Sequence, residues 1–183
     1  PPDGALATSL DIAATSIAAD GIGNVFVLDA PRCVILRIST DGRVSRFAGK
    51  YTDCGSDGDG GSARDARIQT LGSFVPGIAV DTEGVVYVAE ANPPRDAPAG
   101  TMGRVRKIDR SSTISHFAGS RRADRFVVDL EPAATAPLLS PESVLPTPIG
   151  VFIGDGLFVY WVFNKTFEQL VGVSGLDGLI FRF

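Results

Sequence analysis

An internal repeat constrains the fold of this chain more than any other feature of its sequence. The clearest copy contains a stretch rich in aspartate and glycine, a run of small residues, and short apolar runs separated by turns, and parts of this pattern recur in the other two copies. A unit built from such short apolar runs cannot bury its own apolar side chains. Neighbouring copies must therefore stack against one another and share a core.

The first two copies align in two blocks. Residues 17–29 match residues 78–90 at an offset of 61, and residues 38–49 match residues 108–119 at an offset of 70. The second copy is therefore longer between its two blocks. Residues 92–103 lie there, and their prolines and glycine predict a surface loop that accommodates the insertion.

The third copy is less regular than the other two. Residues 129–138 match residues 59–68 at an offset of 70, and residues 151–155 match residues 86–90 at an offset of 65. These matches indicate a true third repeat. When the offset of 65 is extended along the chain, residues 157–163 are expected in a loop.

Each copy predicts four short β-strands. The apolar runs are rich in Val, Ile and Phe and end at glycine-containing turns, whereas no segment keeps a helical period. Asp41-Gly42 and Asp177-Gly178 predict hairpin turns, because glycine adopts a positive φ without a steric cost. The third strand of the third copy is then expected at Val173. Four antiparallel strands per copy are typical of a β-propeller blade.

The motifs of the second copy resemble the NHL repeat. The matching segments are Ala48-Gly49, Gly58-Asp59-Gly60-Gly61, Pro76-Gly77-Ile78-Ala79-Val80-Asp81, Gly84-Val85-Val86-Tyr87-Val88-Ala89-Glu90 and Arg106-Lys107-Ile108-Asp109. The resemblance is strong over residues 3–119 and weak over residues 120–183. Glu90 replaces an aspartate of the family pattern, and Thr15 replaces a proline.

The resemblance implies an all-β fold, with this chain as a β-propeller portion of about three four-stranded blades within a larger, six-bladed propeller. The repeats of this single unit span approximately residues 3–58, 59–128 and 129–183. Closed propellers have 4 to 8 blades, so three blades leave two open edges. We expect the remaining blades in a longer chain, or a partner that completes the propeller within a large assembly.

The charge and hydropathy of the chain argue against two classes of partner. A formal net charge of −4 and a pI near 4.9 do not fit nucleic-acid binding, which needs a basic surface. The most apolar stretch, residues 144–163, contains Pro146, Pro148 and several glycines. It therefore predicts strands and turns and not a membrane-spanning helix. We expect neither nucleic acid nor a membrane span.

Three residues bear on the cellular compartment. Cys33 follows the second strand of the first copy and Cys54 follows the fourth, so both are expected on one face of the blade. They form either a disulfide, which stabilises by roughly 3 kcal/mol and requires an oxidising compartment, or two unpaired thiols. Asn164 begins a glycosylation sequon, Asn164-Lys165-Thr166. These features favour a secreted or lumenal protein, with an organellar assembly as the alternative.

No catalytic, cofactor-binding or metal-binding residue is predicted. The glycine-rich linker contains Asp53, Asp57, Asp59 and Asp65. An EF-hand calcium loop that starts at Asp57 would need a carboxylate at its fifth position, but Gly61 stands there. The single histidine, His116, excludes a three-histidine zinc site within this chain.

Four further carboxylates lie near the inner strands, at Asp20, Asp29, Asp81 and Glu90. They recur between copies, and a catalytic set is expected to occur once. We interpret them as turn and strand-end residues, and we expect the linker aspartates to have structural roles as well.

Function is expected where the copies differ, because loops carry the function of a repeat scaffold. Three such places are predicted on the face that carries the cysteines: residues 92–103, the basic residues of the next linker, and residues 157–163. The expected partner-binding residues are Phe158, Tyr160, Trp161, Phe163, Arg121, Arg122 and Arg125. Alternatively, residues 157–163 form a re-registered strand and the arginines are simply solvated.

The sequence thus favours a non-catalytic protein-binding or scaffolding module without a cofactor, whose ligand face is built from inter-strand loops. Two alternatives stay open. One is a fragment of a lactonase-like or lyase-like propeller enzyme whose metal ligands lie in missing blades. The other is a structural subunit of a large multi-protein assembly. The resemblance alone does not choose among them, because that family includes scaffolds, ligand binders and a few enzymes.

Overall fold

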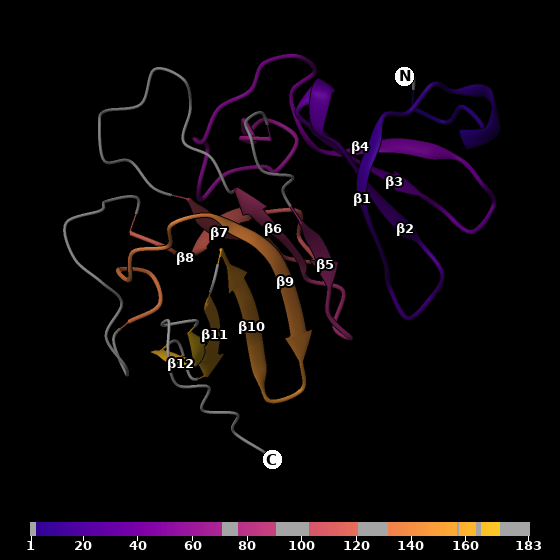
Figure 1. The fold of residues 1–183 in the computed structure, drawn as a ribbon. Coiled ribbons are helices and arrows are strands. Elements are labelled where there is room, and N and C mark those ends of the chain that lie inside the picture. The colour runs from indigo at the N-terminus through magenta and orange to yellow at the C-terminus, as the bar shows by residue number, and fades with distance from the viewer. Residues whose placement is uncertain are drawn as a thin grey trace.

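The computed structural model describes residues 3–70, 77–90, 103–120, 132–156, 158–163 and 166–172, the last of these by their backbone alone (Figure 1). Its described residues contain no α-helix, only the short 3-10 turns η1 (Ala7–Ser9) and η2 (Ala30–Arg32). None of the described residues forms a helix that is long and apolar enough to cross a membrane.

Within the described residues, twelve strands form three antiparallel sheets of four strands each, and the strands of each sheet lie in chain order. Blade 1 comprises β1 (Ala14–Ala19), β2 (Val25–Asp29), β3 (Val34–Ile38) and β4 (Val44–Gly49). Blade 2 comprises β5 (Ile78–Val80), β6 (Val86–Glu90), β7 (Arg104–Ile108) and β8 (Ile114–Ala118). Blade 3 comprises β9 (Pro141–Thr147), β10 (Gly150–Asp155), β11 (Phe158–Phe163) and β12 (Thr166–Gly172). The predicted all-β fold of three four-stranded blades is confirmed.

The blades stack face to face along the chain. We call the face of a blade that is turned toward the preceding repeat its front face, and the opposite face its back face. The first strands lie next to one another, β1 beside β5 and β5 beside β9 (Figure 1). Because side chains alternate along a strand, each blade offers one set of residues to each neighbour.

The core between blades 1 and 2 shows how two blades join. The back face of blade 1 contributes Phe26 and Ile35, and the front face of blade 2 contributes Val88 and Ile108. The small and apolar linker residues, Ala63, Ala66 and Ile68, are buried in the same cluster. The junction of blades 2 and 3 repeats this plan with Ala133, Ala136 and Leu138.

The segment 3–13 precedes blade 1 and occupies the place of an inter-blade linker. The amide of Gly4 donates to the carbonyl of Val44 at 2.7 Å, as the amide of Gly60 in the next linker donates to the carbonyl of Ile114 at 2.8 Å. Apolar residues of this segment pack against the buried front face of blade 1. Blade 1 therefore carries a linker on its front face.

A recurring glycine lies at the end of the fourth strand because of a close backbone approach. Gly49 and Gly119 both end a Phe-Ala-Gly triplet, and they have φ angles of 83° and 101°. A Cβ atom on Gly119 would lie 2.8 Å from the carbonyl oxygen of Gly103. The predicted turn at Asp41-Gly42 also forms, with Gly42 at φ 78°. Glycine is thus required where the chain leaves a blade.

The expected register of the third copy is wrong. The offset of 65 places residues 158–163 in a loop, but they form β11, the third strand of blade 3, so the alternative of a re-registered strand is confirmed. Val162 pairs with Val151 as Ile108 pairs with Val86, so Val162 and not Val173 occupies the third-strand position. Blade 3 has a short connection before this strand where blade 2 has its long insertion. An offset fitted to the second strand therefore does not extend to the third. The predicted turn at Asp177-Gly178 lies outside the described residues.

Candidate functional site

The face that carries the β2–β3 loop is fixed by a disulfide. Cys33 follows η2 and adopts φ 57°, and Cys54 lies in the linker after β4. The structure joins their sulfur atoms, with the two Cα atoms 5.2 Å apart. The bond ties the linker to blade 1, and Cys33 is completely buried.

A buried ionic network ties the same linker to the front face of blade 2. Glu90 accepts from Arg104 Nε at 2.7 Å and from Arg106 Nη1 at 3.2 Å. Asp59 accepts from Arg104 Nη1 at 2.7 Å and from Arg106 Nε at 2.9 Å. Glu90 and both arginines are buried, and the hydroxyl of Ser56 donates to Glu90 at 2.6 Å. Two carboxylates therefore balance two guanidinium groups.

The electrostatics of this network agree with its geometry. Burial opposes ionisation of Asp59, but the charges of Arg104 and Arg106 outweigh it and lower the pKa of the Asp59 carboxyl. Burial lowers the pKa of Arg104, but Glu90 and Asp59 together outweigh burial, so that the pKa is raised. Both groups are charged at neutral pH and neutralise each other, which is a structural role.

Two other linker aspartates also have a structural partner. Asp57 accepts from Arg67 Nε at 3.0 Å, and Asp53 lies 3.5 Å from the same guanidinium group. Within the ranges that the structure describes, no three His, Cys, Asp or Glu side chains are grouped closely enough to hold a metal ion. The structural interpretation of the linker aspartates is therefore supported by their contacts.

The recurring carboxylates occupy turns and strand ends, as the sequence indicated. Asp20 accepts from the amide of Asn24 at 2.8 Å, and Asp81 accepts from the amide of Val85 at 2.8 Å. Asp29 ends β2 and accepts from Arg32 at 2.7 Å. These carboxylates close local backbone turns or bind a neighbouring arginine, like the linker aspartates.

His116 lies on β8, the outer strand of blade 2, where the sequence placed it. Its Nε2 atom lies 3.0 Å from the carbonyl oxygen of Ala134 in the following linker. The imidazole is thus a contact between a blade and a linker.

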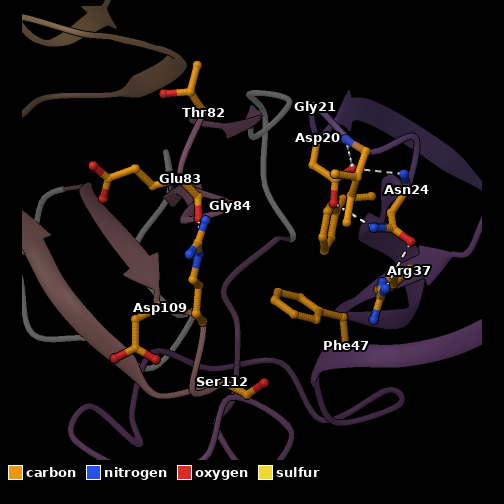
Figure 2. A pocket seen from close by; sticks show the side chains of 13 residues that line it. Asp20, Gly21, Asn24, Arg37, Phe47, Thr82, Glu83, Gly84, Asp109 and Ser112 are labelled. Carbon is orange, nitrogen blue, oxygen red and sulfur yellow. Dashed lines mark hydrogen bonds between the residues drawn. The ribbon is translucent and has the colours of Figure 1, made fainter.

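A cavity of about 320 Å³ lies between blades 1 and 2, at the strand ends opposite the disulfide (Figure 2). Its blade 1 wall holds Phe47 beside a polar chain in which Arg37 Nη2 donates to Asn24 Oδ1 at 2.9 Å and Asn24 Nδ2 donates to Asp20 at 2.6 Å. Blade 2 contributes Arg110 and its neighbours to the other wall. The Nε atom of Arg37 is buried without a hydrogen-bond partner.

The structure divides the predicted aromatic patch between the two faces of blade 3. Phe158 and Tyr160 point to the front face and pack into the core shared with blade 2. Trp161 and Phe163 point to the back face, with ring centroids 5.1 Å apart. The patch is therefore a strand with two sides and not a loop on the cysteine-bearing face. Only two of its four predicted contact residues lie on the outward side.

Three further apolar residues complete this back face. Leu145 pairs with Phe152, and Phe152 pairs with Trp161. Leu145, Phe152 and Trp161 therefore form one row across β9, β10 and β11. Val159 lies beside them on β11. The rings of Phe152 and Trp161 stack with centroids 6.1 Å apart. Leu145 is 62% exposed, Phe163 50% and Val159 37%.

The sequence interpretation missed the back face as a unit because it placed β11 in a loop. The sequence does not reveal the two faces, because all six residues from 158 to 163 are apolar or aromatic and show no alternation. The other predicted site residues, Arg121, Arg122, Arg125 and Asn164, lie outside the described residues, as does most of the insertion at 92–103.

No family model matches the chain, and neither does any curated protein. Solved structures share its fold. A protein of unknown function from Bacteroides thetaiotaomicron is 20% identical with a TM-score of 0.52, and the match covers 80% of this chain and 32% of that one. An auxiliary nutrient binding protein from Bacteroides ovatus is 10% identical with a TM-score of 0.55, over 87% of this chain and 36% of that one. This chain spans about a third of either structure, and the likeness concerns the fold alone.

Proposed function

We propose that this chain is an NHL-type propeller portion that acts as a non-catalytic protein-binding module, with the back face of blade 3 as its contact surface. One observation carries the proposal: the same positions are covered in both other blades. Ile35 and Val105 are completely buried by the following blade, whereas Val159 at the equivalent position is 37% exposed. The following blade covers this apolar back face in blades 1 and 2, so we expect a protein partner to cover it in blade 3.

Two findings support binding over catalysis. The recurring carboxylates already serve turns, strand ends and ion pairs. Of the two similar structures described above, one is an auxiliary nutrient binding protein and the other is a protein of unknown function. The disulfide between Cys33 and Cys54 supports an oxidising compartment, which favours a secreted or lumenal location.

A photo-crosslinking amino acid tests the proposed surface. It is introduced in place of Leu145 on the back face or, as a control, in place of Ile22, which is 78% exposed in the β1–β2 turn. In cells that express the chain, we expect covalent protein adducts from position 145 and few from position 22. Equal yields from the two positions, or no adduct at either, would overturn the proposal.

The cavity between blades 1 and 2 favours a second function, the binding of a small ligand with a carboxylate or hydroxyl group. The supporting observation is the buried Nε atom of Arg37, which has no partner in a wall that also holds the ring of Phe47. The substitution Arg37→Ala should abolish the thermal stabilisation by any small carboxylate that stabilises the wild type. The matched variant Arg43→Ala, in the exposed β3–β4 turn, should leave it unchanged.

A further inference from the structure

The two junctions inside this chain follow one rule. The back face of one blade, the linker that follows it, and the front face of the next blade form a single buried cluster. Between blades 1 and 2, Ile78 on the front face packs in the same cluster as Ile35 on the back face. Between blades 2 and 3, Val144 takes the place of Ile78 and packs against the cluster that holds Val105.

The front face of blade 1 is buried at Val27, Leu36 and Val44, but among the described residues its first strand lacks the cover that this rule requires. Ile17 pairs with Val27 as Ile78 pairs with Val88, so Ile17 is the equivalent of Ile78. Ile78 is only 7% exposed, whereas Ile17 is 67% exposed. The linker that the junction needs is already in place, because residues 3–13 lie on blade 1 as residues 59–70 lie on blade 2.

The chain thus carries both halves of an unfilled junction, one at each end of its row of blades. The back face of blade 3 offers Leu145, Phe152 and Val159, and the front of blade 1 offers Ile17 with its linker. Within these three blades the two halves cannot meet, because blade 2 stands between them. The back face of blade 3 in one chain can meet the front face of blade 1 in another. This contact would have the same arrangement as the junctions between blades 1 and 2 and between blades 2 and 3.

We propose that the back face of blade 3 binds the front face of blade 1 of a second copy of this chain. Two such contacts, related by a twofold axis, close a ring of six blades, within the 4 to 8 blades of closed propellers. The inference rests on the proposed function and identifies its partner. A ring also covers both the exposed first strand of blade 1 and the back face of blade 3 in each copy, which a single contact does not.

Sedimentation analysis of the purified 183-residue chain tests the ring. We expect twice the chain mass of 19.2 kDa. Either Ile17→Glu or Leu145→Arg should raise the dissociation constant at least about tenfold, because a buried, unpaired charge opposes both contacts. Ile22→Glu, at an exposed apolar residue outside both faces, is the matched control and should remain dimeric. Both test positions are more than 60% exposed, and Ile17→Ser and Leu145→Ser provide milder variants.

A mixture of the two charged variants gives the sharper result. One contact of the mixed dimer is native, and the other brings opposite charges together. The mixture should therefore dimerise where each variant alone is monomeric. A monomeric wild type, an open-ended polymer, or a dimer that resists both substitutions would overturn the inference.

The failure of this inference is distinguishable from the failure of the proposed function. If the wild-type chain is monomeric and the adducts at position 145 contain another protein, the binding function stands and the ring is wrong. If no adduct forms at position 145 and the chain is monomeric, both are wrong. Adducts that contain two copies of this chain, from a dimer that Ile17→Glu dissociates, support both.

Discussion

Blades 2 and 3 present opposite chemistry at the same position of their front faces. Blade 2 places Arg104 and Arg106 there, and blade 3 places Phe158 and Tyr160 in the equivalent register. The two guanidinium groups bind carboxylates, whereas the two rings stack with centroids 6.0 Å apart. The second and third strands nevertheless pair in the same register in both blades, so this pairing does not depend on which chemistry fills the junction.

The residue that ends the second strand differs in the same way. Glu90 in blade 2 binds the two arginines, whereas Asp155 in blade 3 accepts from the backbone amide of Leu139 at 2.9 Å and from that of Ser140. A buried ion pair stabilises little when intact but costs much when one partner is lost. The two junctions should therefore respond differently to the loss of one charge.

The largest effect is expected from Glu90→Gln, which leaves two buried arginines with only Asp59 as their counter-charge. The free energy of unfolding should fall by about 3–5 kcal/mol, as for other broken buried pairs. Asp155→Asn, the matched change in blade 3, removes a hydrogen-bond acceptor without stranding a cation and should cost about 1–3 kcal/mol. Urea unfolding of both variants measures the difference, and equal losses would contradict it.

Converting the blade 2 network into blade 3 chemistry tests the same comparison from the other side. The combined variant Asp59→Asn, Glu90→Leu, Arg104→Phe and Arg106→Tyr removes every charge of the network at once. Because no buried charge is stranded, it should lose less stability than Glu90→Gln alone. A loss as large as the sum of the single substitutions would show that the charges contribute independently.

Blade 1 extends the comparison, because a covalent bond fixes its junction. Cys33→Ser should lower the free energy of unfolding by roughly 3 kcal/mol, since it opens a loop whose ends are 21 residues apart. Unfolding of the wild type with and without a reductant provides the control, and the reductant should reproduce the effect of the substitution. A variant that unfolds at the wild-type urea concentration would show that the bond does not stabilise the junction.

The smallest effects concern pH, where Asp59 and Asp155 should act with opposite signs. Burial opposes the charge of Asp59, but the two arginines prevail and lower its pKa, so its stabilisation is present above the unfolded pKa of 3.8 and is lost as the pH falls. Burial raises the pKa of Asp155, so its contribution is present below 3.8 and is lost as the pH rises through the folded pKa.

The stability of the wild type relative to two variants measures these signs. The advantage of the wild type over Asp59→Asn should shrink as the pH is lowered from 7 toward 3. Its advantage over Asp155→Asn should instead shrink as the pH is raised across the same range. Parallel trends for the two variants would contradict the assignment.

Much of the fold was predictable because its determinants are local. The turn at Asp41-Gly42 and the repeated glycine at positions 49 and 119 follow from backbone sterics within a few residues. The β11 register failed because the alignment assumed a connection of constant length before the third strand. A change in the length of that connection moves the whole strand along the sequence, and an offset measured on the second strand does not report it.

The candidate surface was predictable only in part. Trp161 and Phe163 were singled out by composition, but their separation from Phe158 and Tyr160 depends on which face of β11 meets blade 2. Likewise, the union of Asp59 with two arginines more than forty residues away follows from the stacking of a linker on a blade.

Short-range patterns in the sequence are enough to specify three four-stranded repeats with their turn residues and structural carboxylates, because each of these features depends on a few neighbouring residues. Which blade faces are covered and which are open, and so where a partner can bind, depends on how the blades pack. Ile17 and Ile78 stand at equivalent positions of their copies, yet one is 67% and the other 7% exposed. The exposures differ because Ile78 packs against the back face of blade 1, whereas no described blade packs against Ile17.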